Sequence, residues 1–146
     1  MTDFSLRTKW LSLYQSKKQA ERDASDAIEL AKARLTKTTH NMSGMPSAHS
    51  GRDSMAEGTY RLQKAQEHWM KVHNDAVIFR IRLEGCIYAS HMNDKDSRML
   101  ALMYLEGATQ NQAAEALGKS SAGGTYIHRR AVSALKMPAD WHEDLQ

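Results

Sequence analysis

The residues whose types and spacing suggest a chemistry lie near the C-terminus. Between Ala116 and Ala139 the sequence has four basic residues and no acidic one, a local charge of +4. The basic residues are Lys119, Arg129, Arg130 and Lys136, and His128 adds charge at lower pH. Lys and Arg side chains bind the phosphate groups of nucleic acids, so we expect a basic surface in this segment.

A pattern typical of a helix-turn-helix surrounds the basic residues. Ala113 and Ala114 are small, as they must be where two helices cross closely, and Gly118 follows where a tight turn requires a positive φ. Thr109-Gln110-Asn111-Gln112 has the spacing of a capping box, so Thr109 is the predicted N-cap. Ile127 is the expected buried anchor of the second helix, which in this motif enters the major groove.

Three short helices must position these residues. The sequence predicts them at about Lys95–Leu105, Gln110–Leu117 and Ser121–Lys136, separated at Gly107 and Gly118. The acidic tail Ala139–Gln146 is expected to fray unless Trp141 docks.

Upstream, two long helices are predicted over about Ser5–Lys37 and Asp53–Ser90, with a loop at Thr38–Arg52 between them. The second has a coiled-coil seam with apolar steps of three and four. The expected architecture is all-α: a helical hairpin over residues 1–92 with its loop at about 38–52, a helix-turn-helix domain over 93–138 and a tail over 139–146. The seam residues are Met55, Gly58, Leu62, Ala65, Trp69, Val72, Ala76, Phe79, Leu83 and Cys86.

Beyond Ala76 the apolar face of the second long helix widens. The added residues are Val77, Ile78, Ile81, Ile87 and Tyr88. Such a wide face is expected to be buried on more than one side, either by the C-terminal domain or by another subunit. Trp10, Trp69 and Phe79 are expected in the core.

Composition excludes several classes of protein. With 8 Gly and 2 Pro the chain has too few turn formers for a barrel or sandwich, and the single Cys86 forms no intramolecular disulfide, which fits the cytoplasm. No nucleotide, hydrolase or metalloprotease motif is present, so we expect neither an enzyme nor a cofactor. His68 and His73 point apart on a helix, so no metal site is expected, and no apolar stretch is long enough to span a membrane.

The C-terminal zone resembles region four of bacterial sigma factors. Nearly the whole chain is similar to the RinA/ArpU-type late transcription regulators of phages that infect Gram-positive bacteria, including Met45-Pro46-Ser47, Asp53 and the helix to Tyr88. This resemblance implies a sigma-like activator of phage late genes in the bacterial host cell, with double-stranded DNA and host RNA polymerase as partners. The residues that carry it are Arg98, Leu100, Tyr104, Leu105, Gly107, Ala113, Leu117, Ser120, Ala131 and Leu135.

One residue departs from the sigma-like pattern, because Gly124 stands where an apolar β-branched residue is usual. Either the second helix begins later, near Thr125, or the glycines let the backbone approach a phosphate. Tyr126 is open between stacking and core. The candidate DNA-binding residues are Ser121, Thr125 and Arg129 for the groove, Thr109, Gln110, Lys119, Ser120 and Arg130 for phosphates, and His128.

Two other functions stay open. A small terminase-like packaging subunit would join such a motif to an oligomerising helical segment, and a protein-interaction module would bind RNA polymerase instead of DNA. Residues 94–146 carry 6 basic and 7 acidic residues, a net charge of −1, which predicts modest affinity for DNA and a need for a polymerase partner or for a homodimer through the hairpin. Changing Arg129 and Arg130 to alanine is expected to weaken DNA binding without loss of helicity.

Overall fold

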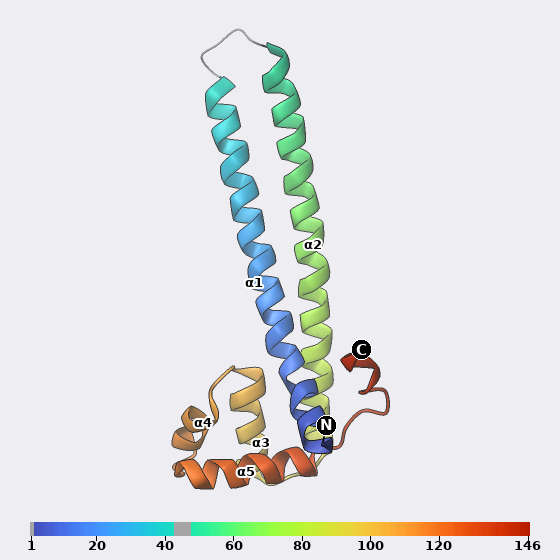
Figure 1. Ribbon diagram of the computed structural model, residues 1–146, viewed down its shortest axis with the longest axis vertical. Coiled ribbons are helices and arrows are strands. Elements are labelled where there is room, and N and C mark those ends of the chain that lie inside the picture. The colour runs from blue at the N-terminus through green and yellow to red at the C-terminus, as the bar shows by residue number, and fades with distance from the viewer. Residues whose placement is uncertain (1, 43–47) are drawn as a thin grey trace. The chain divides into compact units, whose positions relative to one another are not determined.

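The computed structural model describes residues 2–42 and 48–146, and the side chains of residues 2–37 and 54–146. Within these residues the chain is helical and has no strand, which confirms the all-α prediction (Figure 1). The elements are α1 (Asp3–Met42), α2 (Ala48–Ala89), α3 (Asp94–Leu100), the π-helix η1 (Ala101–Leu105), α4 (Gln110–Ala116), α5 (Ser121–Ala134) and the 3₁₀-helix η2 (Glu143–Leu145).

Helix occupies both ends of the segment that was expected to be a loop. α1 continues to Met42 and α2 begins at Ala48. Extending an existing helix fixes one residue for each hydrogen bond gained, so residues of modest helix propensity continue a helix that has already formed. The centre of the expected loop, residues 43–47 with Met45-Pro46-Ser47, lies outside the described residues.

The chain divides into two compact units. The terminal unit consists of Met1–Ser16 and Val77–Gln146, and the central unit is Lys17–Ala76. Each long helix therefore contributes to both units. The domain boundaries expected from the sequence, near residues 92 and 138, remain a prediction.

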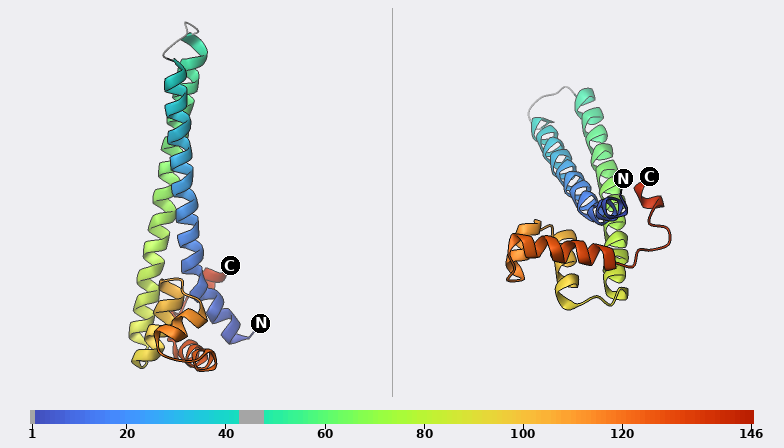
Figure 2. Two further views of the ribbon diagram at one scale, coloured as in Figure 1. Left: turned by 90° about the vertical axis from the view of Figure 1, so that its left-hand side faces the viewer. Right: turned by 60° about the horizontal axis from the view of Figure 1, so that its bottom comes forward.

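In the central unit α1 and α2 lie side by side (Figures 1 and 2). Nδ1 of His73 lies 3.2 Å from a carboxylate oxygen of Glu21, while Gly58 faces the side chain of Leu35. Because the later residue of α1 meets the earlier residue of α2, the two helices run in opposite directions here.

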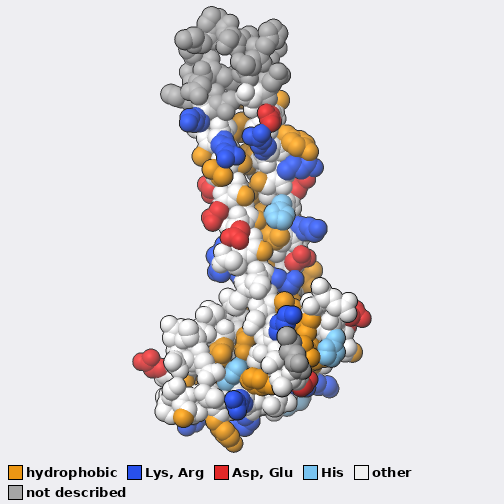
Figure 3. Space-filling view, in the orientation of Figure 1, with side chains coloured by type: hydrophobic (Ala, Val, Ile, Leu, Met, Phe, Trp, Pro, Cys, Tyr) orange, Lys and Arg blue, Asp and Glu red, His pale blue; other side chains and the backbone are white. Residues whose placement is uncertain are grey.

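Burial along the predicted seam is uneven in the central unit. Ala76 is buried, Met55 is exposed, and Trp69, which was expected in the core, is only half-buried and stacks on the ring of His73 with centroids 4.7 Å apart. On the face seen in Figure 3, Lys and Arg side chains are interspersed with Asp and Glu. The half-buried seam residues are Gly58, Leu62, Ala65, Trp69 and Val72.

The terminal unit contains the large side chains of the core. Trp10 and Phe79 are buried as expected, with ring centroids 5.0 Å apart. The first turns of α1, the last turns of α2 and the C-terminal helices all contribute to this cluster. Its buried members are Trp10, Leu11, Tyr14, Phe79, Leu83, Ile87, Leu100, Tyr104, Ala131, Val132, Leu135 and Trp141.

The tail is packed, so of the two alternatives expected from the sequence, docking of Trp141 is the one observed. Trp141 lies in the core with 8% of its surface exposed. The indole N–H of Trp10 donates to a carboxylate oxygen of Asp144 at 2.8 Å, and Arg82 donates to both Asp140 and Asp144. The acidic residues that suggested a solvated tail are the groups that attach it to α2.

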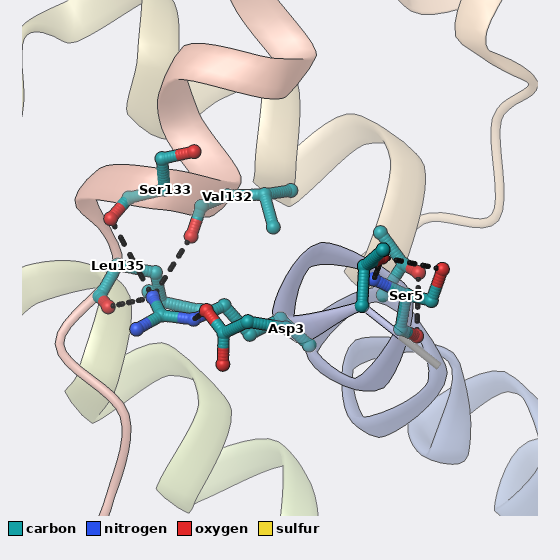
Figure 4. A network of polar contacts seen from close by, with 8 residues as sticks. Asp3, Ser5, Val132, Ser133 and Leu135 are labelled. Atoms are coloured by element: carbon teal, nitrogen blue, oxygen red, sulfur yellow. Dashed lines mark hydrogen bonds and ion pairs between the residues drawn. The ribbon is translucent and has the colours of Figure 1, made fainter.

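The beginning of α1 closes the end of α5 (Figure 4). The Arg7 guanidinium donates to the backbone carbonyls of Val132 at 3.1 Å and Leu135 at 2.8 Å, and it pairs with Asp3. The last carbonyls of a helix have no partner within it, so Arg7 satisfies groups that α5 leaves open. Leu135 is extended, with ψ of 127°, and α5 ends at Ala134 instead of at the expected Lys136.

The helix predicted at Lys95–Leu105 has two parts. Asn93 caps α3 by accepting a hydrogen bond from the backbone N–H of Asp96 at 2.9 Å, and η1 continues the helix with a wider turn. The side-chain amide of Gln15 donates to the carbonyls of Tyr104 and Leu105 at 3.1 and 3.2 Å. A side chain from α1 thus satisfies the carbonyls at this helix end, which the local sequence does not reveal.

The wide apolar face of α2 is largely exposed. Val77, Ile78, Ile81 and Tyr88 are 43, 59, 63 and 85% exposed, whereas Ile87 is 9% exposed. The C-terminal elements therefore cover Ile87 and leave the other four residues uncovered. Of the two alternatives expected from the sequence, the C-terminal domain does not account for this face.

Candidate nucleic-acid interface

The turn between α4 and α5 is closed by a glycine and by backbone hydrogen bonds. Gly118 has a φ of +69°, in the left-handed region, which confirms the predicted need for glycine. The N–H of Lys119 donates to the carbonyl of Ala114 at 2.8 Å, and that of Leu117 donates to Ala113 at 3.1 Å. The direction in which α5 leaves the turn is therefore set by the backbone.

Thr109 and Ser120, two of the residues predicted to contact phosphate, are the N-caps of α4 and α5. Thr109 and Gln112 form the predicted capping box, with hydrogen bonds of 3.2 and 3.0 Å. The hydroxyl of Ser120 accepts a hydrogen bond from the N–H of Gly123 at 3.1 Å and caps α5. Each hydroxyl keeps its own proton for a further acceptor, so Thr109 and Ser120 can still donate to a phosphate.

Gly124 explains the departure from the sigma-like pattern. A Cβ at this position would lie 2.5 Å from the Cβ of Ala114, so only glycine fits between α4 and α5 here. α5 begins at Ser121, and the alternative that it starts near Thr125 is wrong. The glycine permits α4 and α5 to cross closely at the position where the sigma-like pattern has a β-branched residue.

Polar side chains also connect α4 to α5 near the crossing. The amide of Gln110 donates to the hydroxyl of Thr125 at 2.8 Å, and the hydroxyl of Ser121 donates to Asn111 at 3.1 Å. Three of the predicted DNA-binding residues therefore lie together at one surface, where they hold each other in place.

Arg130 joins α5 to α3. Its guanidinium donates to both carboxylate oxygens of Asp96, the shortest bond being 2.7 Å, and the Asp96 side chain is 4% exposed. These bonds raise the pKa of Arg130. The guanidinium also lies 5.2 Å from the ring centre of Tyr126, which is 64% exposed and so is not a core residue. Arg130 is a positioning residue, because its loss would leave a buried carboxylate without its partner.

His128 faces inward, so the prediction that it contacts DNA is withdrawn. Nε2 of His128 lies 2.6 Å from the hydroxyl of Tyr104, and its ring packs against Phe4 with centroids 5.7 Å apart. Burial, followed by the charge of Arg129, lowers the pKa of His128, while burial raises the pKa of Tyr104 to about 12. On a helix His128 lies beside Ile127, next to the inner face. In the sequence its basic neighbours suggest an exposed position instead.

The exposed cations include one that the sequence did not indicate. Lys119 and Arg129 are exposed as predicted, and Lys95 of α3 lies beside Lys119. The Lys119 ammonium group lowers the pKa of Lys95, and Arg130 adds to this effect. We call Lys95, Lys119 and Arg130 the cationic patch. Lys95 belongs to another helix and has acidic neighbours, so no local signal identifies it.

No protein-family model, curated protein or solved structure matches the chain. Within the residues that the structure describes, no helix combines the length and hydrophobicity needed to cross a bilayer. In the same residues, no group of three or more His, Cys, Asp or Glu side chains is placed to hold a metal ion.

Proposed function

We propose that the chain is a DNA-binding transcription regulator in which α3–η1, α4 and α5 form a helix-turn-helix similar to sigma region four. The observation that carries this proposal is the cationic patch, with exposed Arg129, beside the close crossing of α4 and α5 at Gly124. Arg130 is paired with Asp96, whereas Lys95 and Lys119 bring two like charges together, and such a concentration of positive charge attracts phosphate. Because of the resemblance to phage late regulators, the proposed targets are phage late genes.

The proposed binding mode places α5 in the major groove. Ser121, Thr125 and Arg129 follow each other at steps of four and so share one side of α5, where they would face base edges. Lys95 and Lys119 would contact phosphates and fix the register.

We further propose that α1 and α2 form a helical hairpin. Through this hairpin two copies of the chain would pair, so that the dimer has two DNA-binding domains. The opposite directions of the helices in the central unit support this proposal. Two linked domains would compensate for the small number of cations that each one offers to DNA.

The test is the variant Lys119→Ala/Arg129→Ala. Neither side chain caps α4 or α5, whose N-caps are Thr109 and Ser120. Arg130→Ala, by contrast, was expected from the sequence to spare the fold but would leave the buried carboxylate of Asp96 without its partner. Fluorescence anisotropy with a duplex selected from a random pool, at several salt concentrations, should show roughly 10-fold weaker binding and a salt slope smaller by about 1.8.

A matched control removes two cations from the central unit. Lys32→Ala/Lys64→Ala changes the net charge equally at exposed positions and should bind DNA like the parent chain. Unchanged affinity of the Lys119→Ala/Arg129→Ala variant would contradict the proposed surface. Ring-sized oligomers in light scattering would instead indicate a terminase-like subunit, and polymerase pull-down without DNA binding would indicate an interaction module.

A further inference from the structure

The exposed apolar residues of α2 in the terminal unit lie on one side of the helix. Val77, Ile81 and Tyr88 fall within about 40° of one another around the helix axis, with Ile78 beside them. The opposite side carries the buried residues Phe79 and Leu83. The helix is therefore apolar on two faces, and the chain packs against only one of them.

Gly85 lies on the same exposed face, in the interior of α2. A Cβ built on it would meet nothing within 4 Å, whereas Gly58 and Gly124 each have a neighbour within the chain. Glycine in a helix interior is destabilising relative to alanine, so the chain gains nothing from Gly85 by itself. A missing side chain between exposed Ile and Tyr residues permits another backbone to approach closely.

We propose that this outer face of α2 binds a second copy of the chain, with the two helices antiparallel and the twofold axis near Ile81. Residues equally distant from the axis then face each other. Val77 lies over Gly85 of the partner subunit, and Ile81 faces its own counterpart. A large residue opposite a glycine, repeated by the symmetry, makes the face complementary to itself.

The charges beside this face also fit a second copy. Arg80 and Glu84 lie on one flank of α2 and form an ion pair of 2.7 Å within the chain. In an antiparallel pair the same flanks meet, so each Arg80 lies between Glu84 and Arg80 of the partner subunit, and opposite charges outnumber like charges among these neighbours. The interface does not depend on DNA binding and is expected without any nucleic acid.

The interface is small, because each copy contributes only four large apolar side chains. Stable interfaces bury about 1,200–2,000 Å² in total, and a single helix crossing lies at or below that range. We therefore expect a dimer in reversible, concentration-dependent equilibrium with the monomer.

Sedimentation equilibrium of the full chain without DNA, over a wide range of concentration, tests this proposal. The Ile81→Glu variant places two carboxylates at the axis and should dimerise at least about 10-fold more weakly. The control Leu30→Glu changes a residue of α1 that is also exposed, 53%, and should dimerise like the parent. Gly85→Ala should weaken the dimer while keeping or raising the melting temperature, a combination that a merely structural glycine would not show.

A charge exchange tests whether the partner is the chain itself. Arg80→Glu and Glu84→Arg should each dimerise poorly alone, and mixing the two variants should restore a heterodimer. A parent chain that stays monomeric at all concentrations, or an Ile81→Glu variant that associates like the parent, would overturn the proposal. Assemblies larger than a dimer that Ile81→Glu leaves intact would overturn it as well.

Discussion

The terminal and central units use the same two long helices but are packed by different means. In the terminal unit Trp10, Leu11 and Leu83 are fully buried, and side chains from α1 and α2 bond to the C-terminal segments. In the central unit the buried residues among those described are Ala24 and Ala76, and most ion pairs join residues one helical turn apart on the surface.

This difference separates the sources of stability. Large side chains packed between several elements specify one arrangement, since each must fit its neighbours. Small residues along two helices permit close contact but bury little area, and exposed pairs one turn apart contribute roughly 0.5 kcal/mol or less each. We expect substitutions to be tolerated far better in the central unit than in the terminal unit.

The largest expected contrast compares two leucines of α2. Leu83 is fully buried in the terminal unit and Leu62 is half-buried in the central unit. Leu83→Ala should lower the free energy of unfolding by about 3–5 kcal/mol, and Leu62→Ala by about 1–2 kcal/mol. Urea titration followed by circular dichroism measures both values.

Tryptophan fluorescence can assign these losses to a unit. In a Trp69→Phe background the remaining Trp10 and Trp141 both lie in the terminal unit, so their emission reports on that unit alone. Equal losses for the two leucine variants would break the comparison, because the central unit would then be packed as tightly as the terminal one.

A second contrast compares two glycines within helices. Gly124→Ala forces its Cβ against Ala114 at 2.5 Å and should destabilise the terminal unit by about 1–3 kcal/mol. Gly58→Ala meets only the flexible end of Leu35 at 3.1 Å, so the gain in helix propensity should dominate and stabilise the central unit by up to about 1 kcal/mol. Thermal unfolding of both variants checks the opposite signs, and a tolerated Gly124→Ala would show that α4 and α5 do not cross closely.

Features of local origin could be predicted from the sequence, and features that depend on distant partners could not. The capping box at Thr109 and the positive φ of Gly118 follow from residues within one turn, and both predictions are confirmed. The partners of Arg130 and His128 are Asp96 and Tyr104, on other elements. From the sequence both residues were predicted to be cations at the surface, because their partners are distant in the chain and only the fold brings them close.

The smallest expected effect concerns pH and again distinguishes the units. Burial, and then the charge of Arg129, lowers the pKa of His128 below its ordinary value of 6.5. Well above pH 6.5 the ring is neutral in the folded and unfolded chain, so it causes no pH dependence there. As the pH falls below 6.5 the unfolded chain takes up the proton first, and the free energy of unfolding must decrease until the folded-state pKa is reached.

The variant His128→Gln keeps a hydrogen-bonding partner for the Tyr104 hydroxyl and removes the titrating ring. Urea midpoints between about pH 5 and 7.5 should fall less steeply with acid in this variant than in the parent. His68→Gln, which removes an exposed ring of the central unit, is the matched control and should keep the parent's slope. If His128→Gln and the parent had the same slope, His128 would be accessible to protons in the folded chain, and its place on the DNA-binding surface would have to be reconsidered.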